Sequence, residues 1–134
     1  MNKKKLGCVS LGCVLLVLPI ITFYLLDLYA ANYNKEEFMR LKEICLRTDS
    51  WDTARKEIIN NGFSVTEGTN DLHYEHDNAT IWVCRWEYME LWSTRAHYVA
   101  GLPTFNTPFQ GYVFVSDNKI VACYPLMTIG GIEK

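Results

Sequence analysis

The longest uninterrupted apolar stretch lies at the start of the chain. No charged residue occurs from Leu6 to Leu26, a run of 21 positions bounded by lysines at 3–5 and by Asp27. As a helix this run extends about 30 Å, which is the thickness of the hydrocarbon core of a bilayer. The pattern predicts a transmembrane helix over residues 6–26, preceded by a tail at residues 1–5.

Two alternatives for this segment stay open. Leu-Gly-Cys occurs at 6–8 and 11–13 and is similar to the cleavage box of bacterial lipoproteins, although most of the apolar stretch here follows the cysteines. Cleavage after Ala30 or Ala31 would instead make the segment a removable signal. Retention is favoured because a secretory signal has an apolar core of only roughly 7–15 residues.

The flanking charges predict the orientation of the helix. Lysines precede it, whereas Asp27 and the mixed charges at 35–37 follow it. By the positive-inside rule the amino terminus lies in the cytoplasm. We therefore expect a single-pass protein of the inner (plasma) membrane, with a linker at 27–32 and a periplasmic or extracellular domain at 33–134.

Two amphipathic helices are predicted at the start of this domain. Within residues 33–47, Phe38, Leu41 and Cys45 recur at helical spacing. A second helix is expected at about 50–61, where Asp49 or Ser50 supplies an N-terminal cap and Gly62 a left-handed stop. Its apolar positions are Trp51, Ala54 and Ile58.

After Gly62 the hydrophobic period changes to that of strands. Strand-like runs are FSVTE, DLHYEH, ATIWVCRWEY and GYVFVSDNKIVACY. In the third run, Trp82, Cys84, Trp86 and Tyr88 share one face. In the last run, Asp117 and Asn118 form a two-residue hairpin signal that places Val115 opposite Ile120 and Val113 opposite Ala122. The order predicts an α+β domain with two helices packed on one face of an antiparallel sheet.

The order of elements resembles small bacterial envelope proteins of the BamE (SmpA/OmlA) and beta-lactamase-inhibitor-protein type. The resemblance covers roughly Tyr33 to Tyr124 and depends on SWDTARKEIINNGF and VFVSDNKIVACY. The lipoprotein cleavage box of the BamE proteins is missing. The resemblance implies a domain that binds other proteins.

Charge excludes one class of partner. Of the 13 basic residues in the chain, three precede the apolar run, and of the 15 acidic residues, one is Asp27. The remaining ten basic and fourteen acidic residues give the domain a charge of about −4. Nucleic-acid binding needs a basic surface, so no nucleic-acid partner is expected, and binding to anionic lipid headgroups is disfavoured.

Cysteine and histidine residues offer little evidence of chemistry. Cys45, Cys84 and Cys123 allow one disulfide in an oxidising compartment, and Cys84 with Cys123 is the favoured pair because both lie in predicted strands. The alternative is three buried apolar thiols. His73 and His76 in HYEHD point to opposite faces of a strand, which disfavours a metal site.

No catalytic signature occurs in the sequence. A Gly-rich phosphate loop and a GxSxG motif are both missing. We therefore predict no enzyme, no cofactor and no small-molecule substrate.

The segment 88–111 is the candidate recognition surface. It is rich in aromatic residues, and from Gly101 it is interrupted by Gly and Pro. Aromatic residues with arginine are typical of protein interfaces. The alternative is that the rings cover the open face of the sheet. The predicted binding residues are Trp92, Arg95, His97, Tyr98, Phe105 and Phe109.

These features favour a membrane-anchored, non-catalytic protein-binding module. One version is an immunity protein that occludes an envelope-active toxin. The alternative is a structural or accessory subunit of an inner-membrane envelope complex that acts through its transmembrane helix.

Overall fold

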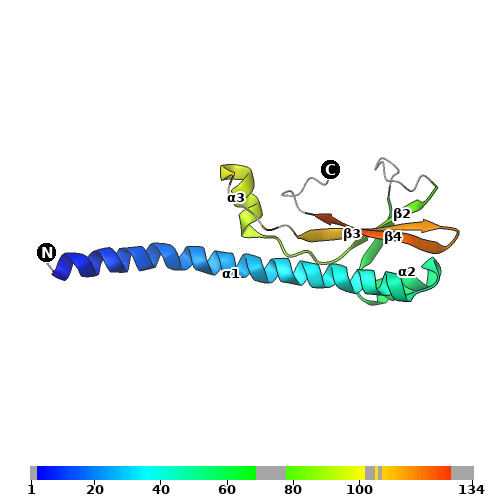
Figure 1. Cartoon of the computed structure of the whole chain (residues 1–134), viewed down its shortest axis with the longest axis horizontal. Helices are drawn as coiled ribbons and strands as arrows, with labels where there is room; N and C mark the ends of the chain where they lie inside the picture. Colours follow the sequence, from blue (N-terminus) through cyan, green and yellow to red (C-terminus); the bar gives the residue numbers. More distant parts are fainter. Residues whose placement is uncertain (1–2, 69–77, 102–104, 106, 128–134) are drawn as a thin grey trace.

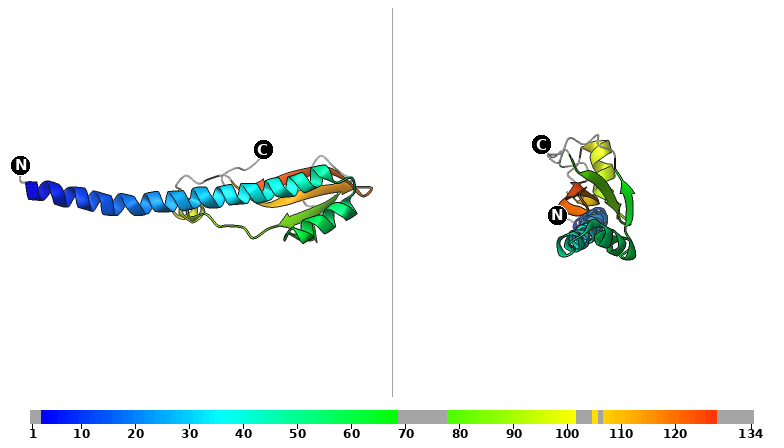
Figure 2. Two further views of the ribbon diagram at one scale, coloured as in Figure 1. Left: turned by 90° about the horizontal axis from the view of Figure 1, so that it is seen from below. Right: turned by 90° about the vertical axis from the view of Figure 1, so that its right-hand side faces the viewer.

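The computed structural model describes residues 3–68, 78–101, 105 and 107–127. In chain order its elements are α1 (Lys3–Arg47), α2 (Trp51–Asn60), β1 (Ser64–Glu67), β2 (Thr80–Arg85), α3 (Trp92–Ala100), β3 (Pro108–Ser116) and β4 (Lys119–Met127). The strands form one antiparallel sheet in the order β1-β2-β3-β4. Helix α2 and the C-terminal half of α1 lie along one face of this sheet (Figures 1 and 2), which confirms the predicted α+β fold.

Helix α1 is a single element of 45 residues. Residues 27–32, which the sequence predicts as a linker, are helical; this stretch contains leucine and alanine and has neither glycine nor proline. The N-terminal half of α1 projects beyond the rest of the molecule (Figures 1 and 2) and exposes large apolar side chains, such as Leu16 at 73% and Ile20 at 67%. Among the described residues, α1 is the one helix long and apolar enough to cross a membrane.

Helix α2 begins and ends where the sequence predicts. The Ser50 side chain accepts a hydrogen bond from the Thr53 N–H, and Gly62 follows the last turn with a φ of 90°. The turn of the final hairpin contributes a further cap, because the main-chain oxygen of Asn118 accepts a bond from Trp51 N at 2.8 Å. The N-terminus of α2 is thereby fixed to the β3–β4 hairpin.

The hairpin itself has the predicted two-residue loop. Asp117 and Asn118 have φ values of 49° and 61°, the conformation that a tight hairpin turn requires. Val115 pairs with Ile120 as expected. The second expected pair is wrong by one residue: Val113 lies opposite Cys123, because a register shift between Phe114 and Val115 inserts an extra position.

The main core lies between the helices and the sheet. Leu41 of α1, Ile58 of α2 and Val113 of β3 are fully buried in it. Gly111 lies at a close approach of α1 to β3, because a Cβ atom built there would lie 2.4 Å from Cδ2 of Leu41. Trp82, Cys84 and Trp86 all contribute to this core, whereas Tyr88, the fourth residue predicted on the same face, packs in a separate cluster with Leu91.

A second cluster occupies the opposite face of the sheet. It consists of Ile81, Val83, Tyr112 and Phe114, each at most 7% exposed. The strand predicted from DLHYEH, with His73 and His76, lies outside the described residues.

Candidate functional site

The segment after β2 returns to α1 and docks against the end of its apolar half. We call this contact the helix junction and define it by Asp27, Ala31 and Asn34 of α1 with the opposing residues of segment 88–107. The three α1 residues follow one another at i, i+4 and i+7, so they lie on one face of the helix. All three are buried.

Asp27 caps helix α3. Its two carboxylate oxygens accept hydrogen bonds from Trp92 N at 2.6 Å and from Ser93 N at 2.9 Å. These N–H groups begin α3 and have no partner within that helix, and the positive end of the helix dipole favours a carboxylate there. An acidic side chain of α1 therefore fixes the start of a helix 65 residues away.

Asn34 binds the main chain of the same segment at Met89, three residues before Trp92. Its Oδ1 accepts a bond from Met89 N at 3.0 Å, and its Nδ2 donates to Met89 O at 2.9 Å. Asn34 is completely buried, and both groups of its amide are satisfied by one residue. Further along, the hydroxyl of Thr107 donates to Ala31 O at 3.2 Å.

Aromatic pairs surround these polar contacts. Trp92 stacks on Phe23 with ring centroids 5.0 Å apart, and Phe105 lies 5.3 Å from Tyr24. Leu91 is fully buried beside them, within a cluster that includes Ala30 and Ala31. Segment 88–107 is thus attached to α1 over several turns, beginning inside its apolar half.

The structure separates the predicted binding residues into groups. Trp92 and Phe105 pack on α1, although Trp92 stays 49% exposed, and Phe109 packs against Tyr88 at 6.1 Å. Arg95 points to solvent and forms two hydrogen bonds of 2.7 Å with Glu90, which hold the pKa of that carboxyl below its usual range. The side chains of His97 and Tyr98 lie outside the described residues. The segment therefore has two parts, one packed on α1 and one exposed on α3.

Sequence reasoning missed Asp27, Asn34 and helix α3. In the sequence Asp27 marks the border of the predicted membrane helix, and Asn34 carries no prediction. The available signal is their spacing of seven residues, which places both polar side chains on the face that later carries Phe38 and Leu41.

Three cysteines converge in the main core. Cys84 lies opposite Gly111 and Cys123 opposite Val113, on the two sides of β3. Two strand spacings alone separate their Cα atoms by at least about 9–10 Å, beyond the roughly 7 Å limit for a disulfide. Both are free cysteines, and the thiol of Cys123 shares a hydrogen bond with Cys45 instead. The fold therefore does not favour the predicted Cys84–Cys123 pair.

Burial of the Cys84 thiol makes the stability of the fold depend on pH in the alkaline range. Burial raises the pKa of Cys84 from 9.0 to about 12. The folded protein holds this proton more tightly than the unfolded chain, so its stabilising contribution is complete below about pH 9 and is lost as the pH rises toward 12. Urea unfolding between pH 7 and 10.5 should show a loss of about 1.4 kcal/mol per pH unit above pH 9 from this thiol.

The matched control is Cys84→Ala. Its free energy of unfolding should fall less steeply above pH 9, because the thiol whose pKa burial raises is gone. Equal slopes in the two proteins would contradict the assignment.

Comparison with protein-family models, curated proteins and solved structures gives no match to this chain. The resemblance to the BamE type therefore stays a prediction. Among the described residues, no three His, Cys, Asp or Glu side chains are grouped so as to hold a metal ion.

Proposed function

We propose that this protein is a single-pass membrane-anchored, non-catalytic protein-binding module, with its amino terminus in the cytoplasm and its α+β domain on the outer side. The observation that carries the proposal is the exposure of the apolar half of α1. Leu15, Leu16 and Ile20 are each more than 60% exposed, as on a helix that has no protein around it. Burying such side chains in lipid is favourable by about 25 cal/mol per Å².

The helix junction supports a role for the domain at the membrane surface. Phe23 lies three residues inside the end of the apolar run, and Trp92 stacks on it. Tryptophan is enriched where hydrocarbon meets water. Helix α3 would therefore lie at the membrane surface, and its exposed Val99, Arg95 and Trp92 would be presented to a partner there.

Charge supports one version of this function. A domain charge of about −4 would attract a basic partner and accelerate its encounter with the anchored protein. In that version the protein is an immunity protein that occludes an envelope-active toxin. Tethering to the membrane would raise its effective concentration for any envelope partner.

A structural or accessory role in an envelope complex is the second candidate. It is favoured by the unbroken path of α1 from its apolar half into the domain core, where Leu41 is fully buried. A helix of this kind could assemble with other membrane helices and position the domain. The two functions make different demands on residues 6–26. A binding module needs only an apolar anchor there, whereas a structural subunit needs the particular residues that contact other membrane helices.

Photo-crosslinking in native membranes tests the proposal. A benzophenone amino acid replaces Val99, which is 89% exposed on α3, and in a matched variant it replaces exposed Lys56 on α2. We expect a discrete protein adduct from position 99 and none from position 56, with the protein retained in the membrane after alkaline carbonate washing.

A second chain, in which residues 6–26 are replaced by a leucine–alanine span of equal length, distinguishes the two candidates. The binding module should keep the position-99 adduct, whereas the structural subunit should lose it. Release of the full-length chain by carbonate, or adducts to lipid alone at position 99, would contradict the proposed function.

A further inference from the structure

Helix α1 has an outer face that none of the other described elements covers. Leu25, Asn32, Met39 and Leu46 recur every seven residues, and all four are exposed, with Met39 at 59% and Leu46 at 78%. We call these four residues the outer row. The opposite side of the same turns is buried and includes Asn34, Phe38, Leu41, Ile44 and Cys45.

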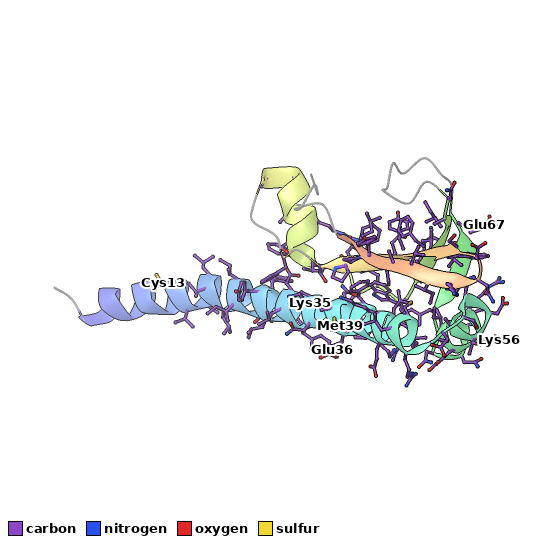
Figure 3. The ribbon with its side chains drawn as sticks, turned by 45° about the vertical axis from the view of Figure 1, so that its right-hand side comes forward. Cys13, Lys35, Glu36, Met39, Lys56 and Glu67 are labelled. Atoms are coloured by element: carbon purple, nitrogen blue, oxygen red, sulfur yellow. The ribbon has the colours of Figure 1, made fainter. Side chains whose placement is uncertain are left out.

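Charged residues of opposite sign flank the outer row. At about 100° per residue, Lys35 and Lys42 lie on one side of Met39, whereas Glu36 and Glu43 lie on the other. The same residues line one shallow depression along α1 with Asn32, Met39 and Leu46. Figure 3 shows Lys35, Glu36 and Met39 along this stretch of the helix.

The arginines beside the outer row are used within the chain, because Arg40 pairs with Glu37 and Arg47 pairs with Glu57. Within the part of the chain that the structure describes, Lys35, Lys42, Glu36 and Glu43 form no ion pair.

We propose that the outer row is the interface of a parallel, two-fold symmetric dimer, and that its occupant is a second copy of this chain. Rotation about a two-fold axis parallel to α1 brings the lysine side of one helix against the glutamate side of the other. Lys35 then meets Glu36 of the second copy, and Lys42 meets Glu43, with each pair only about 1.5 Å apart along the axis. An antiparallel arrangement would place lysine against lysine.

Two further features agree with a parallel arrangement. The anchoring proposed above gives every copy the same direction, which is the direction that the charges require. In the parallel arrangement Asn32 of the outer row meets Asn32 of the second copy, where the two amides can hydrogen-bond to each other. Shared anchoring in one bilayer also raises the effective concentration of each copy for the other.

Charge exchange tests the dimer in the full-length protein. One chain carries Lys35→Glu with Lys42→Glu, and a second carries Glu36→Lys with Glu43→Lys. Each is reconstituted in neutral phosphatidylcholine vesicles, with donor or acceptor dyes at the carboxy terminus, and energy transfer is measured against dilution in lipid.

We expect energy transfer for the unaltered chain and a dimer at least about tenfold weaker for each altered chain alone, because four ion pairs become like-charge contacts. Mixing the two altered chains should restore it. The control is Lys56→Glu with Lys119→Glu, which changes the net charge equally at exposed positions away from α1 and should leave the dimer intact.

Three results would overturn the dimer. They are no energy transfer for the unaltered chain, equal energy transfer in all the variants, and a mixture that behaves like its separate components. Carbonate washing of the same vesicles reports anchoring independently, so that a monomeric but anchored protein would contradict the dimer and leave the proposed function standing.

Discussion

Replacing Asp27 by alanine is expected to release helix α3 from α1. The substitution leaves the N–H groups of Trp92 and Ser93 without their acceptor, in a place where Asp27 is only 3% exposed. A hydrogen bond to a charged group contributes about 1.5–3 kcal/mol, so the loss of both bonds should cost about 3–6 kcal/mol. The two amides should exchange with solvent deuterium at least about a hundredfold faster than in the unaltered protein.

Asp27→Asn provides the graded comparison. It keeps one oxygen acceptor and the size of the side chain, and we expect roughly half of the destabilisation. Asp52→Ala is the control, because this residue also lies in the first turn of a helix but is exposed, and should cost well under about 1 kcal/mol. Unchanged exchange of the Trp92 and Ser93 amides in Asp27→Ala would show that the junction is held by its aromatic contacts instead.

Gly111→Ala is expected to destabilise the contact between α1 and β3. The added methyl would lie 2.4 Å from Cδ2 of Leu41, and Leu41 has no exposed surface into which it could move. Overpacking of this kind costs about 1–3 kcal/mol. Leu41→Ala alone should cost about 2–5 kcal/mol because it leaves a cavity.

The double variant decides whether this close approach is the cause. In Gly111→Ala with Leu41→Ala, the new methyl enters the space that the leucine vacates, so the combined loss of unfolding free energy should be at least about 1 kcal/mol smaller than the sum. Gly111→Ala with Ile58→Ala on α2 is the control and should be additive. Additive losses in both pairs would contradict the proposed clash.

Sequence motifs correctly predict those elements of the fold that are stabilised by contacts between residues close together in the chain. Helix α2 follows from Ser50 and Gly62, and the final hairpin from Asp117 and Asn118, because each residue acts on a backbone within a few positions of itself. The register beyond Val115 could not be predicted in the same way. The register shift between Phe114 and Val115 depends on how β3 and β4 pair, and the alternation of apolar residues within either strand does not reveal it.

Helix α3 could not be predicted from the sequence for a related reason. Its cap is supplied by Asp27, so nothing near Trp92 in the sequence marks its beginning. Segment 88–111 was recognised as unusual from its aromatic residues, but whether Trp92 and Phe105 face a partner or their own chain depends on α1 returning beside them. The cysteines show the same limit, since Cys45 meets Cys123 only because α1 crosses the sheet there.

The absence of a hinge between the two halves of α1 has a mechanical consequence. A helix of 45 residues is about 68 Å long, and beyond Pro19, which lacks a backbone N–H, it continues with regular turns to Arg47. Any tilt or rotation imposed on the apolar N-terminal half of α1 would therefore be transmitted along the helix to the sheet. If α1 is anchored as proposed, the thickness and composition of the bilayer would set the angle at which the sheet is held.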